Sequence, residues 1–329
     1  MGLPIFDYLI APWPRYFEIG EIIVNFIGYM PLGFVMVFAL PQSWAWKRQV
    51  AITVLCAALL SFCMETMQNF LPMRVSSNVD LLANSVGAFL GALAGVRWGQ
   101  AIFAPGRGLT YWRERYIADD GLTGDIALIL IVLWVFVQLT PDQLLFAGGE
   151  LRSLLDIPPP LPFEPARLIV FETAQTASMM LAVGLFARCT LRTSGSALVL
   201  GLLLLGMGAR LAGSTFFFVP SNPLAWLTPG VQYGFFTGAA LLFIALRLPR
   251  VAQHALAGAS LLMASVLINV IPESPYSGGG PVIIRRANYL NFYALCRLVA
   301  AIWPFAALAY LSALGLWRGE RLESGRSAG

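Results

Sequence analysis

The sequence predicts an all-α, polytopic integral membrane protein with about nine transmembrane helices, an outside N-terminus and an inside C-terminus. Composition is the first observation: 58% of the 329 residues are hydrophobic and only 12% are charged, with a mean hydropathy of +0.74. Soluble domains carry about 25% charged residues, so too few polar side chains remain to cover a surface in water. The second observation is a succession of apolar segments, and the third is the placement of arginines between them.

A bilayer is spanned by about 20 mostly apolar residues. Segments of this kind recur along the whole chain, and the shortest of them, 124–140, is counted as a span too. The predicted helices lie near 18–40, 49–71, 81–103, 124–140, 168–187, 196–218, 227–247, 252–271 and 290–314.

Basic residues of the predicted loops are divided unevenly, with thirteen on one side and six on the other. Cytoplasmic loops are enriched in Lys and Arg, which gives the orientation stated above. We expect a three-helix N-terminal domain over 15–103, a cytoplasmic linker over 104–123, a C-terminal membrane domain over 124–316 and a disordered tail over 317–329. The outside loop 141–167 contains Glu150–Asp156, a candidate amphipathic helix on the membrane surface.

Several classes of function lack support in the sequence. The formal charge of +4 is spread over short loops rather than gathered in a basic run, so no nucleic-acid partner is predicted. Four cysteines without CxxC spacing and a single histidine, His254, argue against a disulfide framework, a metal site or a histidine-based triad. We find no cofactor motif, and Met1–Ile10 lacks the basic start of a cleaved signal peptide.

Polar residues gather in the front of the chain, where ionisable groups in lipid tend to mark a functional site. Arg74 falls between two acids, Glu65 and Asp80, and could neutralise one of them through a bidentate pair. The predicted binding residues are Asn25, Glu65, Gln68, Arg74, Asp80 and Asn84, with Glu65 and Asp80 as candidate catalytic groups and Glu21 as a secondary candidate.

Structural roles compete with these interpretations. Asp80 could simply cap the helix that it opens, because a carboxylate there meets the positive end of the helix dipole. The pairing of Arg74 with an acid could be an inert staple. Ala83, Gly87, Gly91 and Gly95 recur every four residues, which favours close helix packing over a binding role.

The back of the chain adds weaker candidates. Glu172 and Gln175 repeat the Glu-Thr-x-Gln string that begins at Glu65, although a single four-residue match is best explained by chance. Arg210 and Arg297 lie within apolar segments, and each needs an acid, a carbonyl or water as its partner; Glu172 is the obvious acid to pair with one of them.

The front of the chain resembles the VanZ-like family of bacterial membrane proteins. The resemblance is carried by Asn25-Phe-Ile-Gly-Tyr-Met-Pro31-Leu-Gly33-Phe34, Glu65-x-x-Gln68-x-Phe70, Arg74, and Ser77-x-x-Asp80-Leu81-x-x-Asn84-x-x-Gly87-Ala88. It covers roughly 15–103 and leaves about six spans behind it without a counterpart. It implies a multi-pass protein of the bacterial inner membrane, in a family whose founding member is associated with low-level resistance to teicoplanin.

Three functions remain open at this stage. The leading hypothesis is a protein that binds or handles a cell-envelope lipid, a lipid-linked wall precursor or an amphiphilic drug, such as a glycopeptide, in an outward polar pocket. The second is an intramembrane acid–base enzyme acting on a lipid-linked substrate, although no nucleophile is recognisable. The third is a proton-coupled carrier, for which the sequence offers no convincing inverted repeat. Membrane lipids are partners in all three cases, and the oligomeric state is not predicted.

Overall fold

A computed structural model describes the chain over residues 7–10, 12–13, 19–68, 77–103, 106, 108–117, 121–139, 143–152, 155, 157–192, 195–217, 224–272 and 290–327. These residues form two compact units, Met1–Trp112 and Arg113–Gly329. The boundary falls inside the stretch 104–123 that was predicted to be a linker.

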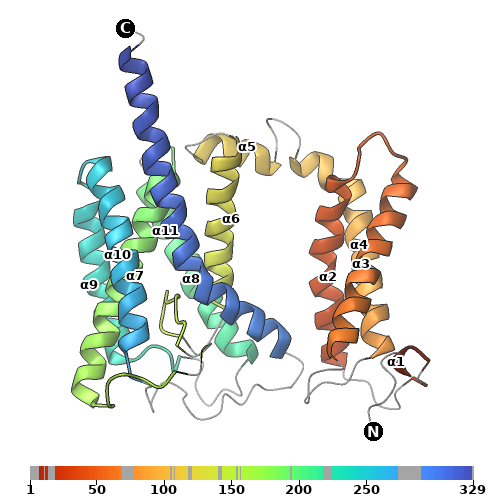
Figure 1. Ribbon diagram of the computed structural model, residues 1–329, viewed down its shortest axis with the longest axis horizontal. Helices are drawn as coiled ribbons and strands as arrows, with labels where there is room; N and C mark the ends of the chain where they lie inside the picture. The colour runs from red at the N-terminus through yellow and green to blue at the C-terminus, as the bar shows by residue number, and fades with distance from the viewer. Residues whose placement is uncertain are drawn as a thin grey trace. The chain divides into compact units, whose positions relative to one another are not determined.

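Helices account for all the regular elements of the described residues, apart from one isolated bridge between Ile117 and Leu191. Unit 1 contains the first four helices and the start of the fifth, and unit 2 contains the others (Figure 1). In chain order they are α1 (Asp7–Ile10), α2 (Ile19–Ala39), α3 (Trp46–Gln68), α4 (Asn78–Phe103), α5 (Gly108–Tyr116), α6 (Gly121–Val137), α7 (Pro165–Thr190), α8 (Ser196–Phe217), α9 (Pro229–Ala245), α10 (Arg250–Val270) and α11 (Leu290–Ser327).

Each of the nine predicted spans coincides with a helix in the described part of the chain. Seven of these helices, α2, α3, α4, α7, α8, α10 and α11, are long and apolar enough to cross a membrane. The other two, α6 and α9, are apolar but have 17 residues each. A helix of that length lies at the lower limit for a span. The all-helical fold of the described residues, with seven candidate membrane spans, is therefore confirmed, while the count of nine and the orientation stay predictions.

The row of small residues on α4, which includes Gly87, Gly91 and Gly95, packs against α2. We call this contact the α2–α4 seam. A side chain added at Gly87, Gly91 or Gly95 would overlap the backbone carbonyls of α2, successively at Phe26, Met30 and Phe34. The contacts advance together along both helices, so α2 and α4 run parallel, with α3 as the antiparallel helix between them in sequence (Figure 1). Small residues let two backbones approach this closely, which is the packing that the four-residue spacing predicts.

Unit 2 packs around the aromatic residues of α6, α7 and α11. Trp134 and Phe186 are almost fully buried, and Trp303 donates its indole N–H to the carbonyl of Leu130 at 2.6 Å. The Phe186 ring meets the Trp303 ring edge-on at a centroid distance of 5.8 Å. Because α7 supplies buried residues on every turn, it is the central helix of this unit.

A non-helical segment, 143–150, is buried inside unit 2. The Phe146 ring stacks near Trp134 of α6, the N–H of Gly149 donates to Ala300 of α11, and Arg210 of α8 donates to the carbonyl of Leu144 at 2.7 Å. Irregular backbone is tolerated in an apolar surrounding only where the protein itself satisfies its polar groups. We call 143–150 the buried loop.

Asn269 of α10 hydrogen-bonds several backbone groups in and directly after the buried loop. Its side-chain oxygen accepts the N–H groups of Leu151 and Arg152 at 2.9 and 3.1 Å, and its amide donates to the carbonyl of Gly149 at 2.7 Å. Gln138 accepts the N–H of Phe146 at 3.0 Å. This arrangement corrects the expectation of a surface helix over Glu150–Asp156, because the described residues 150–152, 155 and 157 are not helical and Arg152 is buried.

Two expected loops contain helix. Residues 108–116 of the predicted linker form α5, and α11 continues to Ser327 through the stretch expected to be a disordered tail. Five of the eleven residues of the 317–327 stretch are Arg or Glu, which are good helix formers and can extend a helix that already has many turns.

The α2–α4 seam gives a first prediction. Gly91→Ala should lower the free energy of unfolding by about 1–3 kcal/mol, because its methyl group meets the Met30 carbonyl and forces the helices apart. Gly28→Ala is the matched control, since an added Cβ there has no neighbour within 4 Å. Thermal unfolding in detergent measures both, and equal melting temperatures would contradict the seam.

The buried loop gives a second prediction. Asn269→Leu removes the partners of two backbone N–H groups and one backbone carbonyl, of which the Arg152 N–H and the Gly149 carbonyl are partly buried. A buried group left unpaired costs about 1–3 kcal/mol. We expect Asn269→Leu to unfold well below the wild type and Asn269→Asp, which keeps the acceptor, to fall between them. Ser312→Ala, whose hydroxyl bonds only its own helix at an exposed site, is the control. A tolerated leucine at 269 would show that the loop does not depend on this side chain.

Candidate functional site

The C-terminal end of α3 meets the N-terminal end of α4 through Glu65 and Ser77. The Glu65 carboxylate accepts the backbone N–H of Ser77 at 3.1 Å, although Glu65 is only 4% exposed. Ser77 is the N-cap of α4, because its hydroxyl accepts the N–H of Val79 at 3.2 Å. A carboxylate at this position also meets the positive end of the α4 dipole, which explains how a buried acid is stabilised here.

One turn deeper, a second set of polar groups joins all three helices. The Asn84 amide of α4 donates to the Ser61 hydroxyl of α3 at 2.9 Å, and both side chains are buried. The Tyr29 hydroxyl of α2 lies close to the Ser61 side chain and within electrostatic range of Glu65. We call Tyr29, Ser61, Glu65, Ser77 and Asn84 the front cluster.

The front cluster has one unsatisfied acceptor. Asn84 is only 5% exposed, and its side-chain carbonyl oxygen has no hydrogen-bond partner in the part of the chain that the structure describes. Nearly all buried polar groups in native proteins are hydrogen-bonded, so an exception calls for a donor from outside the chain or a specific role.

The predicted site residues are distributed as follows. Glu65 and Asn84 lie in the front cluster. Asn25 is half-buried on α2, one helical turn before Tyr29, and Asp80 is half-buried in the first turn of α4. Arg74 and the side chains of Glu21 and Gln68 fall outside the described residues, so the pairing of Arg74 with an acid stays a prediction.

The expectation that Glu172 pairs with Arg210 or Arg297 is wrong. Glu172 is 2% exposed on α7, and its carboxylate accepts the Thr228 hydroxyl at 2.5 Å instead of an arginine. Arg210 is directed to the Leu144 carbonyl of the buried loop, and Arg297 is half-buried early in α11. A carbonyl satisfies the guanidinium without an ion pair, and this partner was concealed in a segment that resembled a surface loop.

Sequence reasoning overlooked Tyr29, Ser61 and Thr228. Tyr29 follows Asn25 by four residues and Ser61 precedes Glu65 by four, so helical spacing placed each beside a predicted site residue. Thr228 had a weaker signal, a threonine directly before the Pro-Gly pair that opens α9, which is a typical N-cap sequence.

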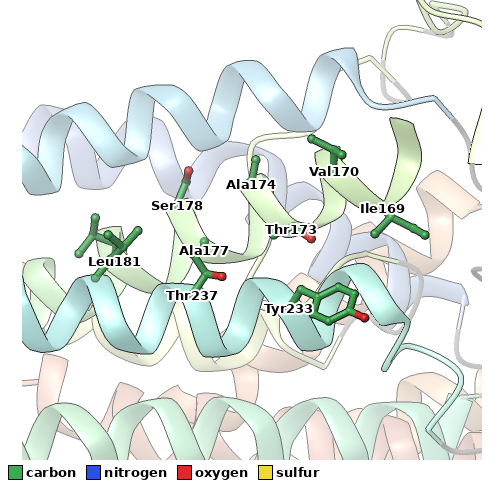
Figure 2. Close-up of a pocket in the computed structure, with 10 residues that line it drawn as sticks. Ile169, Val170, Thr173, Ala174, Ala177, Ser178, Leu181, Tyr233 and Thr237 are labelled. Carbon is green, nitrogen blue, oxygen red and sulfur yellow. The ribbon is translucent and has the colours of Figure 1, made fainter. Parts of the chain in front are cut away.

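A shallow cavity of about 480 Å³ lies between α7 and α9 of unit 2 (Figure 2). Its wall is mostly apolar, with the hydroxyl groups of Thr173, Ser178, Tyr233 and Thr237 along it. Thr173 donates to the Gly230 carbonyl at 3.1 Å, so that hydroxyl serves the helix pair. An apolar cavity of this kind suits hydrocarbon rather than a charged group.

The fold and site together define a polytopic helical membrane protein with buried polar groups at a junction of three helices. The family model VanZ/LLP1 matches residues 4–98, which confirms the resemblance for the N-terminal third of the chain. Comparison with curated proteins and with solved structures gives no match.

The junction of α3 and α4 gives a third prediction. Glu65→Gln keeps an acceptor for the Ser77 N–H but removes the charge, and we expect it to cost about 1 kcal/mol of stability. Glu65→Leu leaves that N–H without its acceptor and should cost about 1–3 kcal/mol more. Chemical unfolding of the two variants measures the difference. If the two variants have the same free energy of unfolding, the hydrogen bond between Glu65 and Ser77 contributes nothing to stability.

Proposed function

We propose that this protein resides in the bacterial inner membrane and binds an amphiphilic component of the cell envelope through the front cluster. The VanZ/LLP1 match and the apolar helices support a membrane protein of this class. The ligands that fit the proposal are a lipid-linked wall precursor, a glycolipid or an amphiphilic drug of the teicoplanin type.

The observation that carries the proposal is the side-chain carbonyl oxygen of Asn84, which has no partner among the described residues and belongs to the same cluster as the Glu65 carboxylate. Both groups accept hydrogen bonds, and Tyr29 and Ser61 add hydroxyl groups at the same level. A headgroup with hydroxyl or amine donors would satisfy them, whereas a bare anion would be repelled by Glu65. Sugars and amino sugars have this chemistry.

Other residues of unit 1 would bind the remaining parts of such a ligand. Arg74 would hold an anionic linkage such as a diphosphate, because a guanidinium binds phosphate through two parallel hydrogen bonds. Asn25, Gln68 and Asp80 would orient the remaining polar groups. Ile23 and Ile27 of α2 and Leu59 of α3 are exposed, and they offer an apolar surface for hydrocarbon chains.

Photolabelling of the full chain in nanodiscs tests the proposal. The probe is a photoactivatable lipid-linked disaccharide wall precursor, with unlabelled precursor and teicoplanin as competitors. Asn84→Leu and Arg74→Ala should each reduce labelling about tenfold or more, since one lost hydrogen bond to a buried or charged group is worth about 1–3 kcal/mol.

Ser85→Ala is the matched control for this experiment. Ser85 is adjacent to Asn84, but its hydroxyl bonds the Leu81 carbonyl of its own helix, so labelling should not change. Equal labelling of all variants, or equal labelling by plain phosphatidylethanolamine, would overturn the proposal. Competition by teicoplanin would extend the ligand class to the drug.

A further inference from the structure

Unit 2 contains a second polar cluster, which the proposed function does not use. Glu172, Gln175 and Thr176 lie on α7 at spacings that place them on one face. Their exposed fractions are 2%, 0% and 0%. We call these three residues the α7 cluster.

Within the described part of the chain, the α7 cluster has four buried polar atoms without hydrogen-bond partners. They are Glu172 Oε1, Gln175 Oε1 and Nε2, and Thr176 Oγ1. Buried polar groups without partners are costly, and these lie on little more than one helical turn. Three of the four are oxygens that can coordinate a cation, whereas Gln175 Nε2 is a donor and does not belong to that set.

The charge of the cluster indicates the sign of that ligand. Thr228 donates to Glu172 Oε2 and caps α9 by accepting the Val231 N–H at 3.2 Å, so this oxygen lies at the positive end of the α9 dipole. That stabilises part of the charge. A carboxylate in an apolar interior normally has a full cationic partner as well.

In the described part of the chain, no cationic side chain supplies that partner. On the helices packed against α7, Asp125 pairs with Arg113, Arg210 bonds Leu144, Tyr233 lines the shallow cavity between α7 and α9, His254 bonds Leu311, and Arg250 lies near Arg188 at the opposite end of α7. Arg297 of α11 is half-buried, and among the described residues no ion pair joins it to Glu172. Among the described residues, the Glu172 carboxyl group therefore has only a hydroxyl and a helix dipole as partners.

We propose that the α7 cluster is a binding site for a small monovalent cation, either Na⁺ or a proton, held by Glu172 with oxygen donors from Gln175 and Thr176. Carboxylate, amide and hydroxyl oxygens are hard ligands, which disfavours transition metals. One carboxylate balances one positive charge, whereas Ca²⁺ sites use six to eight oxygens, several of them from carboxylates.

The site is built into the seam between α7 and α9. A side chain added at Gly230 would meet Glu172, and one added at Gly234 would meet Thr176. Binding of the cation would therefore stabilise the contact between these two helices, and stability is a direct readout of occupancy.

Thermal unfolding of the full chain in nanodiscs tests this proposal. NaCl is compared with choline chloride at constant ionic strength, and the series is repeated between pH 5 and 9. Saturating Na⁺ should raise the melting temperature of the wild type on the order of 5 °C. Glu172→Gln, Gln175→Leu and Thr176→Val should each lose this rise.

Glu164→Gln is the matched control. Glu164 precedes the same helix but is exposed and paired with Arg167 at 2.7 Å, so its variant should respond to Na⁺ like the wild type. The cation is a proton if the melting temperature of the wild type does not change with Na⁺ but does change with pH, and if this pH dependence is absent from Glu172→Gln. If the wild type and Glu172→Gln respond identically to both series, the proposal is overturned. Should Glu172→Gln not fold, ²²Na⁺ binding to the wild type and to Thr176→Val decides in the same way.

Discussion

Each buried backbone or side-chain polar group of this chain has to find its partner within the protein, because the surrounding side chains and lipid offer none. Glu65 accepts the first N–H of α4, and Asn269 and Gln138 serve the backbone of the buried loop. Arg210 donates to a carbonyl of the same loop. Many of the polar side chains that the sequence suggested as site residues thus stabilise the fold by pairing buried polar groups. The few buried polar atoms that this pairing does not satisfy are therefore the better candidates for ligand binding.

The two units share two features, a pair of parallel helices packed through glycines and a buried glutamate at a helix N-cap, but they arrange them differently. In each, a helix packs parallel to the second helix before it along a row of glycines, α4 against α2 and α9 against α7. In each, a buried glutamate reaches the N-cap of a helix. Glu65 lies at the end of α3, however, and Glu172 lies near the start of α7. The shared Glu-Thr-x-Gln string therefore does not mark a repeated fold, and the two clusters are free to take different ligands.

Features with a local cause were predictable from the sequence. Apolar length located the helices, and four-residue spacing identified the α4 seam, since both depend only on neighbours along one helix. The buried loop was not predictable, because 143–150 is too short for a span and its main partner, Asn269, lies about 120 residues further on. The partner of Glu172 was missed for the same reason. In the site, helical spacing could have found Tyr29 and Ser61, whereas the unmet atoms of Asn84 and Gln175 required three-dimensional neighbours.

The parallel packing of α7 and α9 also constrains how the chain is made. Thr228 follows Glu172 by 56 residues, and α8 must be completed between them before the two can meet. During synthesis, α7 therefore leaves the ribosome before Thr228, the hydrogen-bond donor to Glu172, has been made. Its entry into the bilayer should be delayed until α9 emerges, so that α7, α8 and α9 leave the translocation machinery as a group rather than one by one.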